Sequence, residues 1–131
     1  MDNNASSSSG VTEKYNPLIG IVGPCGSGKS TLIAGLEEQG YRCRHIAQEH
    51  SYVKQMWQVI TKPDILIFLQ CSFENSTARR KLNWQPSDYE EQQHRLTHAH
   101  EHAHLIIVTD SLTANEVLEQ VKAYLRERSA S

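Results

Sequence analysis

A glycine-rich segment near the amino end constrains this chain more than any other feature. Residues 23–30 read Gly-Pro-Cys-Gly-Ser-Gly-Lys-Ser and fit the pattern G-x-x-x-x-G-K-[ST] at every fixed position. An apolar run precedes this segment and an amphipathic stretch follows it, which predicts a strand, a tight turn and a helix. Glycines let the backbone N–H groups of such a turn converge without intervening side chains, and the helix start adds a positive dipole end. The segment therefore predicts a site for phosphate groups.

The individual positions of this loop have separate expected roles. Lys29 is expected to reach the β- and γ-phosphates of a nucleoside triphosphate, and the Ser30 hydroxyl is expected to bind Mg²⁺. Thr31 would lie near the α-phosphate, as the resemblance of this loop to P-loop proteins implies. The expected cofactors are ATP and Mg²⁺. The residues predicted to bind them are Gly23, Gly26, Ser27, Gly28, Lys29, Ser30 and Thr31.

Length and composition exclude several classes of protein. The 131 residues suffice for one domain, and a formal net charge of −2 argues against a general nucleic-acid binder. The longest apolar run, residues 65–69, is too short to cross a bilayer, and the first ten residues lack the features of a secretory signal. Three cysteines without a CxxC pair fit free thiols in a reducing compartment. A cytoplasmic protein that does not contact membranes is expected.

Apolar and amphipathic segments alternate beyond a polar tail. Residues 1–15 are rich in Asn and Ser and are expected to form a disordered tail, so that residues 16–131 form the domain. Apolar runs predict strands, and helical periodicity or a capping box predicts helices. The expected strands are 18–22, 41–47, 65–69 and 105–108, and the expected helices are 29–39, 52–60, 72–82, 87–104 and one that opens at 113. This order predicts an α/β fold, a small doubly wound and mainly parallel sheet with helices on both faces.

An acidic side chain for phosphate chemistry is harder to place. The 65–69 strand leads into Gln70 rather than an acid, and Asp110 precedes a capped helix and is expected to be a turn or cap residue. Glu49 follows the second expected strand, and ligands of such sheets bind at the carboxyl ends of strands. With its neighbours Gln48 and His50, Glu49 is the candidate group facing the γ-phosphate or a substrate. An ordinary solvated loop is the alternative.

Three segments together resemble small P-loop kinases, namely the nucleoside monophosphate, shikimate and dephospho-coenzyme A kinases. They are the 23–31 loop, the 62–69 segment in which Pro-Asp precedes a strand, and the basic stretch 78–81. The resemblance spans most of residues 17–127. It implies a lid whose arginines, here Arg79 and Arg80, close over the phosphates. It also implies that the loop after the last strand touches the base.

The function that follows is transfer of the γ-phosphoryl group of ATP to an unidentified small molecule, or ATP hydrolysis. The expected catalytic residues are Lys29, Glu49, Arg79 and Arg80. So short a lid leaves room for a neighbouring subunit of a homo-oligomer to complete the site. Two alternatives stay open. One is a regulatory or assembly protein that binds nucleotide with little turnover, and the other is a GTP-binding protein. The second rests on residues 61–64, Thr-Lys-Pro-Asp, which match the guanine-reading pattern [NT]KxD, although the chain has no DxxG.

Two further groups of side chains need an interpretation. Five histidines fall within residues 94–104, and His94, His98 and His102 share a helix face at spacings of four. Such pairs can chelate zinc, nickel or copper, but a solvent-facing histidine cluster with acid sensitivity is the expected role. Cys25 lies within the loop itself, and its side chain is expected to point away from the phosphates.

Overall fold

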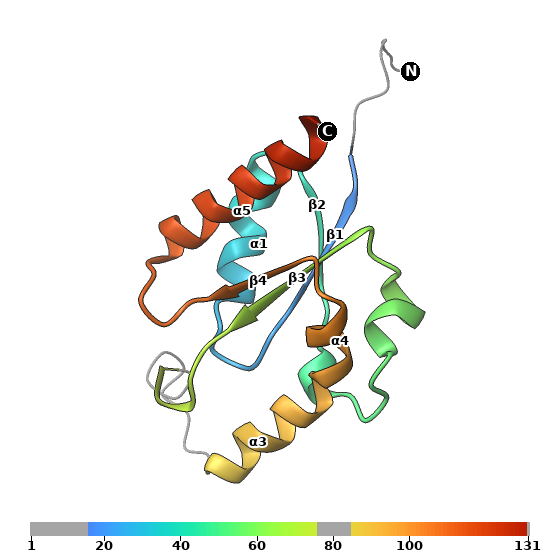
Figure 1. Cartoon of the computed structure of the whole chain (residues 1–131), viewed down its shortest axis with the longest axis vertical. Helices are drawn as coiled ribbons and strands as arrows, with labels where there is room; N and C mark the ends of the chain where they lie inside the picture. The colour runs from blue at the N-terminus through green and yellow to red at the C-terminus, as the bar shows by residue number, and fades with distance from the viewer. Residues whose placement is uncertain (1–15, 76–84, 131) are drawn as a thin grey trace.

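The computed structural model describes residues 16–75 and 85–130, and its centre is a parallel sheet (Figure 1). Four parallel strands lie in the order β2-β1-β3-β4. Their bounds are Leu18–Val22 for β1, Arg42–His45 for β2, Ile65–Gln70 for β3 and Leu105–Val108 for β4. The central strands β1 and β3 are buried along almost their whole length, as expected where helices cover both faces of a parallel sheet.

Different helices cover the two faces of the sheet (Figure 1). α1 (Lys29–Glu38) and α5 (Ala114–Ala130) lie side by side on one face. The other face carries α4 (Thr97–His102), with the short helical turns η1 (Gln48–His50) and η2 (Trp57–Thr61). α3 (Pro86–Arg95) packs against η1 and α4 rather than on the sheet. The predicted doubly wound α/β fold is confirmed.

Alternation of side chains along the strands divides the core into two layers. Ile19, Ile21 and Ile67 face α1 and α5, and Val22, Leu66 and Phe68 face α4 and η2. Successive side chains of a strand point to opposite faces, so one apolar strand supplies both layers. Each fully buried aliphatic side chain contributes about 1.5–3 kcal/mol, so the two layers together hold the sheet between its helices.

The segment at 52–60 does not form the expected amphipathic helix. The structure has a π-type turn at Trp57–Thr61, and only Trp57 of the expected apolar face is buried, while Val53 is 58% and Ile60 74% exposed. The cause is the side chain of Gln48. Its amide oxygen accepts from the Trp57 N–H at 2.9 Å and its amide nitrogen donates to the Val53 carbonyl at 2.8 Å, which holds the segment in an irregular turn.

The expected 87–104 helix starts earlier and is divided in two. α3 begins at Pro86, where the Asp88 carboxylate accepts from the Gln85 N–H at 2.9 Å, so the expected cap at Ser87 is wrong by two residues. Proline favours the first helical position because its missing N–H has no helical partner there. The helix is interrupted at Leu96, next to the Thr97 hydroxyl, which contacts the carbonyl oxygens of Gln93 and His94 and competes with the helical pattern.

The remaining helix starts agree with the sequence where they are described. Thr113 and Glu116 form the expected capping box of α5, with reciprocal bonds of 2.8 and 3.0 Å. Ser72 accepts from the Asn75 N–H at 3.2 Å, which agrees with its expected role as a cap. The rest of the helix expected at 72–82 and the tail expected at 1–15 lie outside the described residues.

Four of the five histidines in the 94–104 cluster make ring or hydrogen-bond contacts, although His100, His102 and His104 remain exposed to solvent, as expected. His98 Nδ1 accepts from the Trp57 indole N–H at 3.0 Å, and the rings of His98 and His102 stack at 4.2 Å. His100 lies edge-on to the Phe68 ring at 4.9 Å. His104 Nδ1 accepts from the Leu66 N–H at 2.9 Å and so extends the hydrogen bonding of β3. These contacts attach α4 to the sheet.

The hydrogen bond that His104 accepts from the Leu66 N–H predicts acid sensitivity. Burial lowers the pKa of His104, and the positive charge of Arg128 lowers it further. At mildly acidic pH, His104 therefore binds a proton more readily in the unfolded chain than in the folded chain. The free energy of unfolding consequently falls as the pH falls through about 6.5. His104→Asn, which keeps an acceptor near the Nδ1 position but does not titrate, should lose less stability than the parent between about pH 7.5 and 5.5.

Urea unfolding at the two pH values measures this difference. His94→Asn is the matched control, because the His94 side chain is exposed, and it should show the pH dependence of the parent. Equal pH dependence in the parent and in His104→Asn would contradict the role given to His104.

Candidate functional site

The glycine-rich loop leaves the carboxyl end of β1 and ends at the first residue of α1. At Gly23 a Cβ atom would lie 2.3 Å from the Leu69 carbonyl oxygen, so no other residue fits there without displacing β3. Gly28 has φ 98° and occupies the N-cap of α1, and no side chain caps that helix. The amide groups of the first turn of α1 therefore face the loop without competition from a capping side chain.

Lys29 reaches back across the mouth of this loop. Its side chain is 6% exposed, and its ammonium donates to the carbonyls of Gly23 at 2.7 Å and Pro24 at 3.1 Å. The third partner is the Glu49 carboxylate, whose Oε2 lies 3.0 Å from Lys29 Nζ. The ammonium therefore stands within the loop, next to a buried acid.

Glu49 belongs to η1, which follows the carboxyl end of β2. Its side chain is 4% exposed, and its backbone carbonyl accepts from Arg95 Nη1 at 3.3 Å. A buried carboxylate is tolerated when it is paired, and removing one partner of such a pair typically costs about 3–5 kcal/mol. The sequence predicted Glu49 as the acid beside the loop, and the structure brings it into contact with Lys29.

A cavity of about 390 Å³ lies between the loop and the end of β2. Its lining residues are Cys25, Gly26, Gly28, Lys29, Ser30, Thr31, His45, Ala47, Glu49 and His50. Burial lowers the pKa of His45, and the Lys29 ammonium adds to that effect. Lys29 thus supplies a buried positive charge on a wall that also carries the Ser30 hydroxyl and the Glu49 carboxylate.

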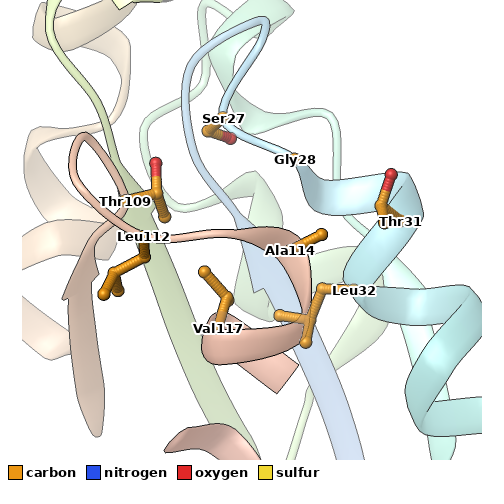
Figure 2. A pocket seen from close by; sticks show the side chains of 8 residues that line it. All are labelled: Ser27, Gly28, Thr31, Leu32, Thr109, Leu112, Ala114 and Val117. Atoms are coloured by element: carbon orange, nitrogen blue, oxygen red, sulfur yellow. The ribbon is translucent and has the colours of Figure 1, made fainter. Parts of the chain in front are cut away.

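A second cavity of about 200 Å³ lies on the other side of the loop, next to the carboxyl end of β4 (Figure 2). It is lined by Ser27, Gly28, Thr31, Leu32, Thr109, Leu112, Ala114 and Val117. In Figure 2 the hydroxyl groups of Ser27, Thr109 and Thr31 lie on one side of the cavity, and the aliphatic side chains of Leu112, Val117 and Leu32 lie on the other. Gly28 and Thr31 line both cavities, so the two meet around the amino end of α1.

Buried polar atoms without partners mark both cavities. Within residues 16–75 and 85–130, the buried side-chain atoms without a hydrogen bond are Ser27 Oγ, Glu49 Oε1 and Gln93 Nε2. Two of them belong to residues that line the cavities beside the loop. Buried polar groups are normally satisfied, so a polar ligand with a bound cation fits this site. Ser30 would hold Mg²⁺ there by its hydroxyl.

The other predicted residues are distributed as follows. The Gln48 side chain points into the core rather than toward the cavity, so its grouping with Glu49 as a ligand-facing residue is wrong. Asp110 accepts from the Ser72 N–H and the Asn75 amide, as a turn residue would. Arg79 and Arg80, the expected lid arginines, lie outside the described residues.

The position of Asp64 argues against the interpretation of residues 61–64 as a guanine-binding motif. Its carboxylate accepts from the Leu18 N–H at 2.8 Å, and its own N–H donates to the Leu18 carbonyl. Asp64 therefore lies at the amino end of β1, whereas the loop leaves the carboxyl end. A base bound beside the loop is out of its reach.

Sequence reasoning missed several residues of the site. Cys25 lines the larger cavity instead of pointing away from it, because its N–H and sulfur are held by the Gln92 amide at 3.0 and 3.3 Å. Thr109 and Leu112 were not predicted as site residues. Only their position in the sequence could have indicated them, because they follow a strand whose carboxyl end lies at the same edge of the sheet as the loop.

Comparison with known proteins identifies a family. A family model described as the NB-ARC domain, a group within the P-loop NTPases, matches residues 8–131. No curated protein matches the chain. Among the described residues, no helix is long and apolar enough to cross a membrane.

Proposed function

Because this chain belongs to the NB-ARC domain family of nucleotide-binding P-loop NTPases, we propose that it binds ATP with Mg²⁺ and transfers or hydrolyses the γ-phosphoryl group. The observation that carries this proposal is the buried pair of Lys29 and Glu49, 3.0 Å apart at the mouth of the loop. A phosphate-binding cation and an acid stand there on the wall of one cavity, which also carries the Ser30 hydroxyl.

The two cavities suit different parts of a nucleotide. The larger one, with Lys29 and Ser30, suits the β- and γ-phosphates and their Mg²⁺ ion. The smaller one, with Leu32, Leu112 and Val117, suits the apolar faces of a nucleoside. The resemblance to small kinases supports this division, because the segment after β4 is where their loops touch the base.

Each residue then has one task. Lys29 exchanges its bonds to the Gly23 and Pro24 carbonyls for bonds to phosphate oxygens. The Ser30 hydroxyl would hold Mg²⁺, which would supply positive charge to the β- and γ-phosphates. Glu49, with one carboxylate oxygen unpartnered, accepts a hydrogen bond from the attacking water or hydroxyl group. Arg79 and Arg80 remain the candidates for neutralising the transferring group from a lid.

A single-turnover assay tests this function. The full chain in excess over γ-labelled ATP should release phosphate in the presence of Mg²⁺ and should not release it when EDTA removes the metal. ATP that stays intact under these conditions, with no labelled acceptor from a mixture of small hydroxylated molecules, would contradict the catalytic proposal.

A second candidate function is a nucleotide-dependent regulator with little turnover. The Lys29–Glu49 ion pair favours it, because it gives the nucleotide-free state its own partner for the lysine and so a defined alternative conformation. This candidate predicts saturable ATP binding together with negligible phosphate release. The single-turnover assay separates the two functions when ATP binding is measured on the same sample.

The role of Ser30 gives a separate prediction. Mg²⁺ should strengthen ATP binding to the parent, and Ser30→Ala should lose most of that gain, at least about tenfold in affinity, because the ion would lose an oxygen ligand. Ser30 is exposed, so the fold should not change. ATP titrations with and without Mg²⁺ measure the difference, and Ser111→Ala, another exposed serine, is the control. An undiminished Mg²⁺ effect in Ser30→Ala would remove Ser30 from the metal site.

A further inference from the structure

Three side chains that bind transition metals meet at the mouth of the larger cavity. Cys25, Glu49 and His50 each offer a ligand atom, and these atoms all lie within 4.8 Å of one another. Cys25 Sγ lies 3.7 Å from His50 Nε2, and His50 Nε2 lies 3.7 Å from Glu49 Oε2. The three residues come from two different segments, the glycine-rich loop and η1, so the fold and not sequence proximity assembles them.

These distances are close to those of a tetrahedral zinc site. Zinc binds sulfur at about 2.3 Å and imidazole nitrogen at about 2.0–2.1 Å, which places neighbouring ligand atoms of a tetrahedron about 3.4–3.6 Å apart. The two separations that involve His50 Nε2 exceed this by a few tenths of an ångström, and small rotations of the His50 ring, which is 59% exposed, are enough to close that difference. The ligand atoms of Cys25 and Glu49 lie within 4.8 Å of each other, so the ion must also draw these two side chains together.

We propose that the nucleotide-free chain binds a zinc ion through Cys25 Sγ, His50 Nε2 and the Glu49 carboxylate. The fourth position of the ion faces the cavity, where water or a small ligand completes the tetrahedron. This site goes beyond the proposed phosphoryl chemistry and does not depend on it. A thiolate among the ligands selects a soft ion and excludes Mg²⁺, which prefers oxygen alone.

Surrounding groups hold the ligands in place. The Gln92 side chain, 7% exposed, donates its amide N–H to Cys25 Sγ at 3.3 Å and accepts from the Cys25 N–H at 3.0 Å. Arg95 donates to the Glu49 carbonyl at 3.3 Å. Such outer contacts orient metal ligands. Glu49 Oε2 lies near His50 Nε2 and also accepts from Lys29, while Glu49 Oε1 is buried without a hydrogen-bond partner, so the carboxylate has one oxygen for each of two cations.

The Lys29 ammonium lies 3.0 Å from Glu49 Oε2, and its positive charge repels a cation bound at this site. A thiolate and a carboxylate bring two negative charges, which offset the ammonium and one charge of the ion. The exposed His50 ring gives the ion a path from solvent. The neutral imidazole and the two anionic ligands therefore make a site of low net charge.

Cobalt(II) is the probe, because it replaces zinc in tetrahedral sites and its bond to a thiolate gives a charge-transfer absorption band. Adding Co²⁺ to the full, nucleotide-free chain should produce this band, and Zn²⁺ should abolish it. Cys25→Ser, a nearly isosteric change, should lose the band. Cys43→Ala and Cys71→Ala remove buried thiols elsewhere and should keep it.

A second variant keeps the test independent of the cysteine. His50→Gln should weaken Co²⁺ binding at least about tenfold, and circular dichroism verifies that each variant is folded. The histidines of α3 and α4 bring no thiolate, so any ion they hold does not give the band. Absence of the band in the parent, its persistence in Cys25→Ser, or unchanged affinity in His50→Gln would each overturn the proposal.

Discussion

Replacing Lys29 by alanine should weaken ATP binding about 10- to 100-fold. The ammonium is expected to bond to phosphate oxygens, and a charged hydrogen bond of this kind contributes about 1.5–3 kcal/mol. The lysine is 6% exposed and already lies inside the loop, so it reaches a phosphate with little ordering cost. Calorimetric titration of parent and variant with ATP and Mg²⁺ measures the difference.

The same substitution has a second effect that must be separated from the first. Without Lys29 the buried Glu49 carboxylate loses its cation, which should lower the free energy of unfolding by about 3–5 kcal/mol. The double variant Lys29→Met, Glu49→Gln removes both charges and should recover most of this stability. If the recovered double variant binds ATP as tightly as the parent, the role of Lys29 in phosphate binding is wrong.

Replacing Glu49 by glutamine should separate binding from turnover. Glutamine has the same shape and can still accept from Lys29, so ATP affinity should stay within a few-fold of the parent. It is a poor base, and loss of a general base lowers the rate about 10²–10⁴-fold. Phosphate release under single-turnover conditions gives the rate, and titration gives the affinity.

Glu91→Gln is the matched control for this prediction. Glu91 is exposed, pairs with Arg95 at 3.2 Å on the surface of α3, and does not line either cavity. The Glu91→Gln variant should release phosphate from ATP at the rate of the parent. Equal rates in Glu49→Gln and the parent would exclude Glu49 from catalysis and favour the regulatory alternative.

Local patterns predicted the sheet and the loop correctly because their causes are local. Short apolar runs such as 65–69, rich in β-branched residues, favour buried strands between two helical layers, and the glycines of the 23–28 turn are required by backbone geometry at that turn. Capping residues such as Thr113 act within one turn of helix. In each case neighbours in sequence determine the structure.

Three of the errors arise where side chains from other segments decide the structure. The turn at 57–61 follows from hydrogen bonds of Gln48, nine residues before Trp57, and no periodicity reveals them. Cys25 turns into the cavity because Gln92, 67 residues away, holds its N–H and sulfur. Thr109 and Leu112 join the site only because β4 ends at the same edge of the sheet as the loop.

The most direct test of the central claim is a calorimetric titration of the unmodified chain with ATP, ADP and AMP, with and without Mg²⁺. A loop that binds the β- and γ-phosphates through Lys29 and Ser30 predicts saturable binding at one site per chain. It also predicts that affinity falls from ATP to ADP to AMP and that Mg²⁺ strengthens ATP binding. A folded chain that shows no saturable binding of ATP, or that binds AMP as tightly as ATP, would contradict the account.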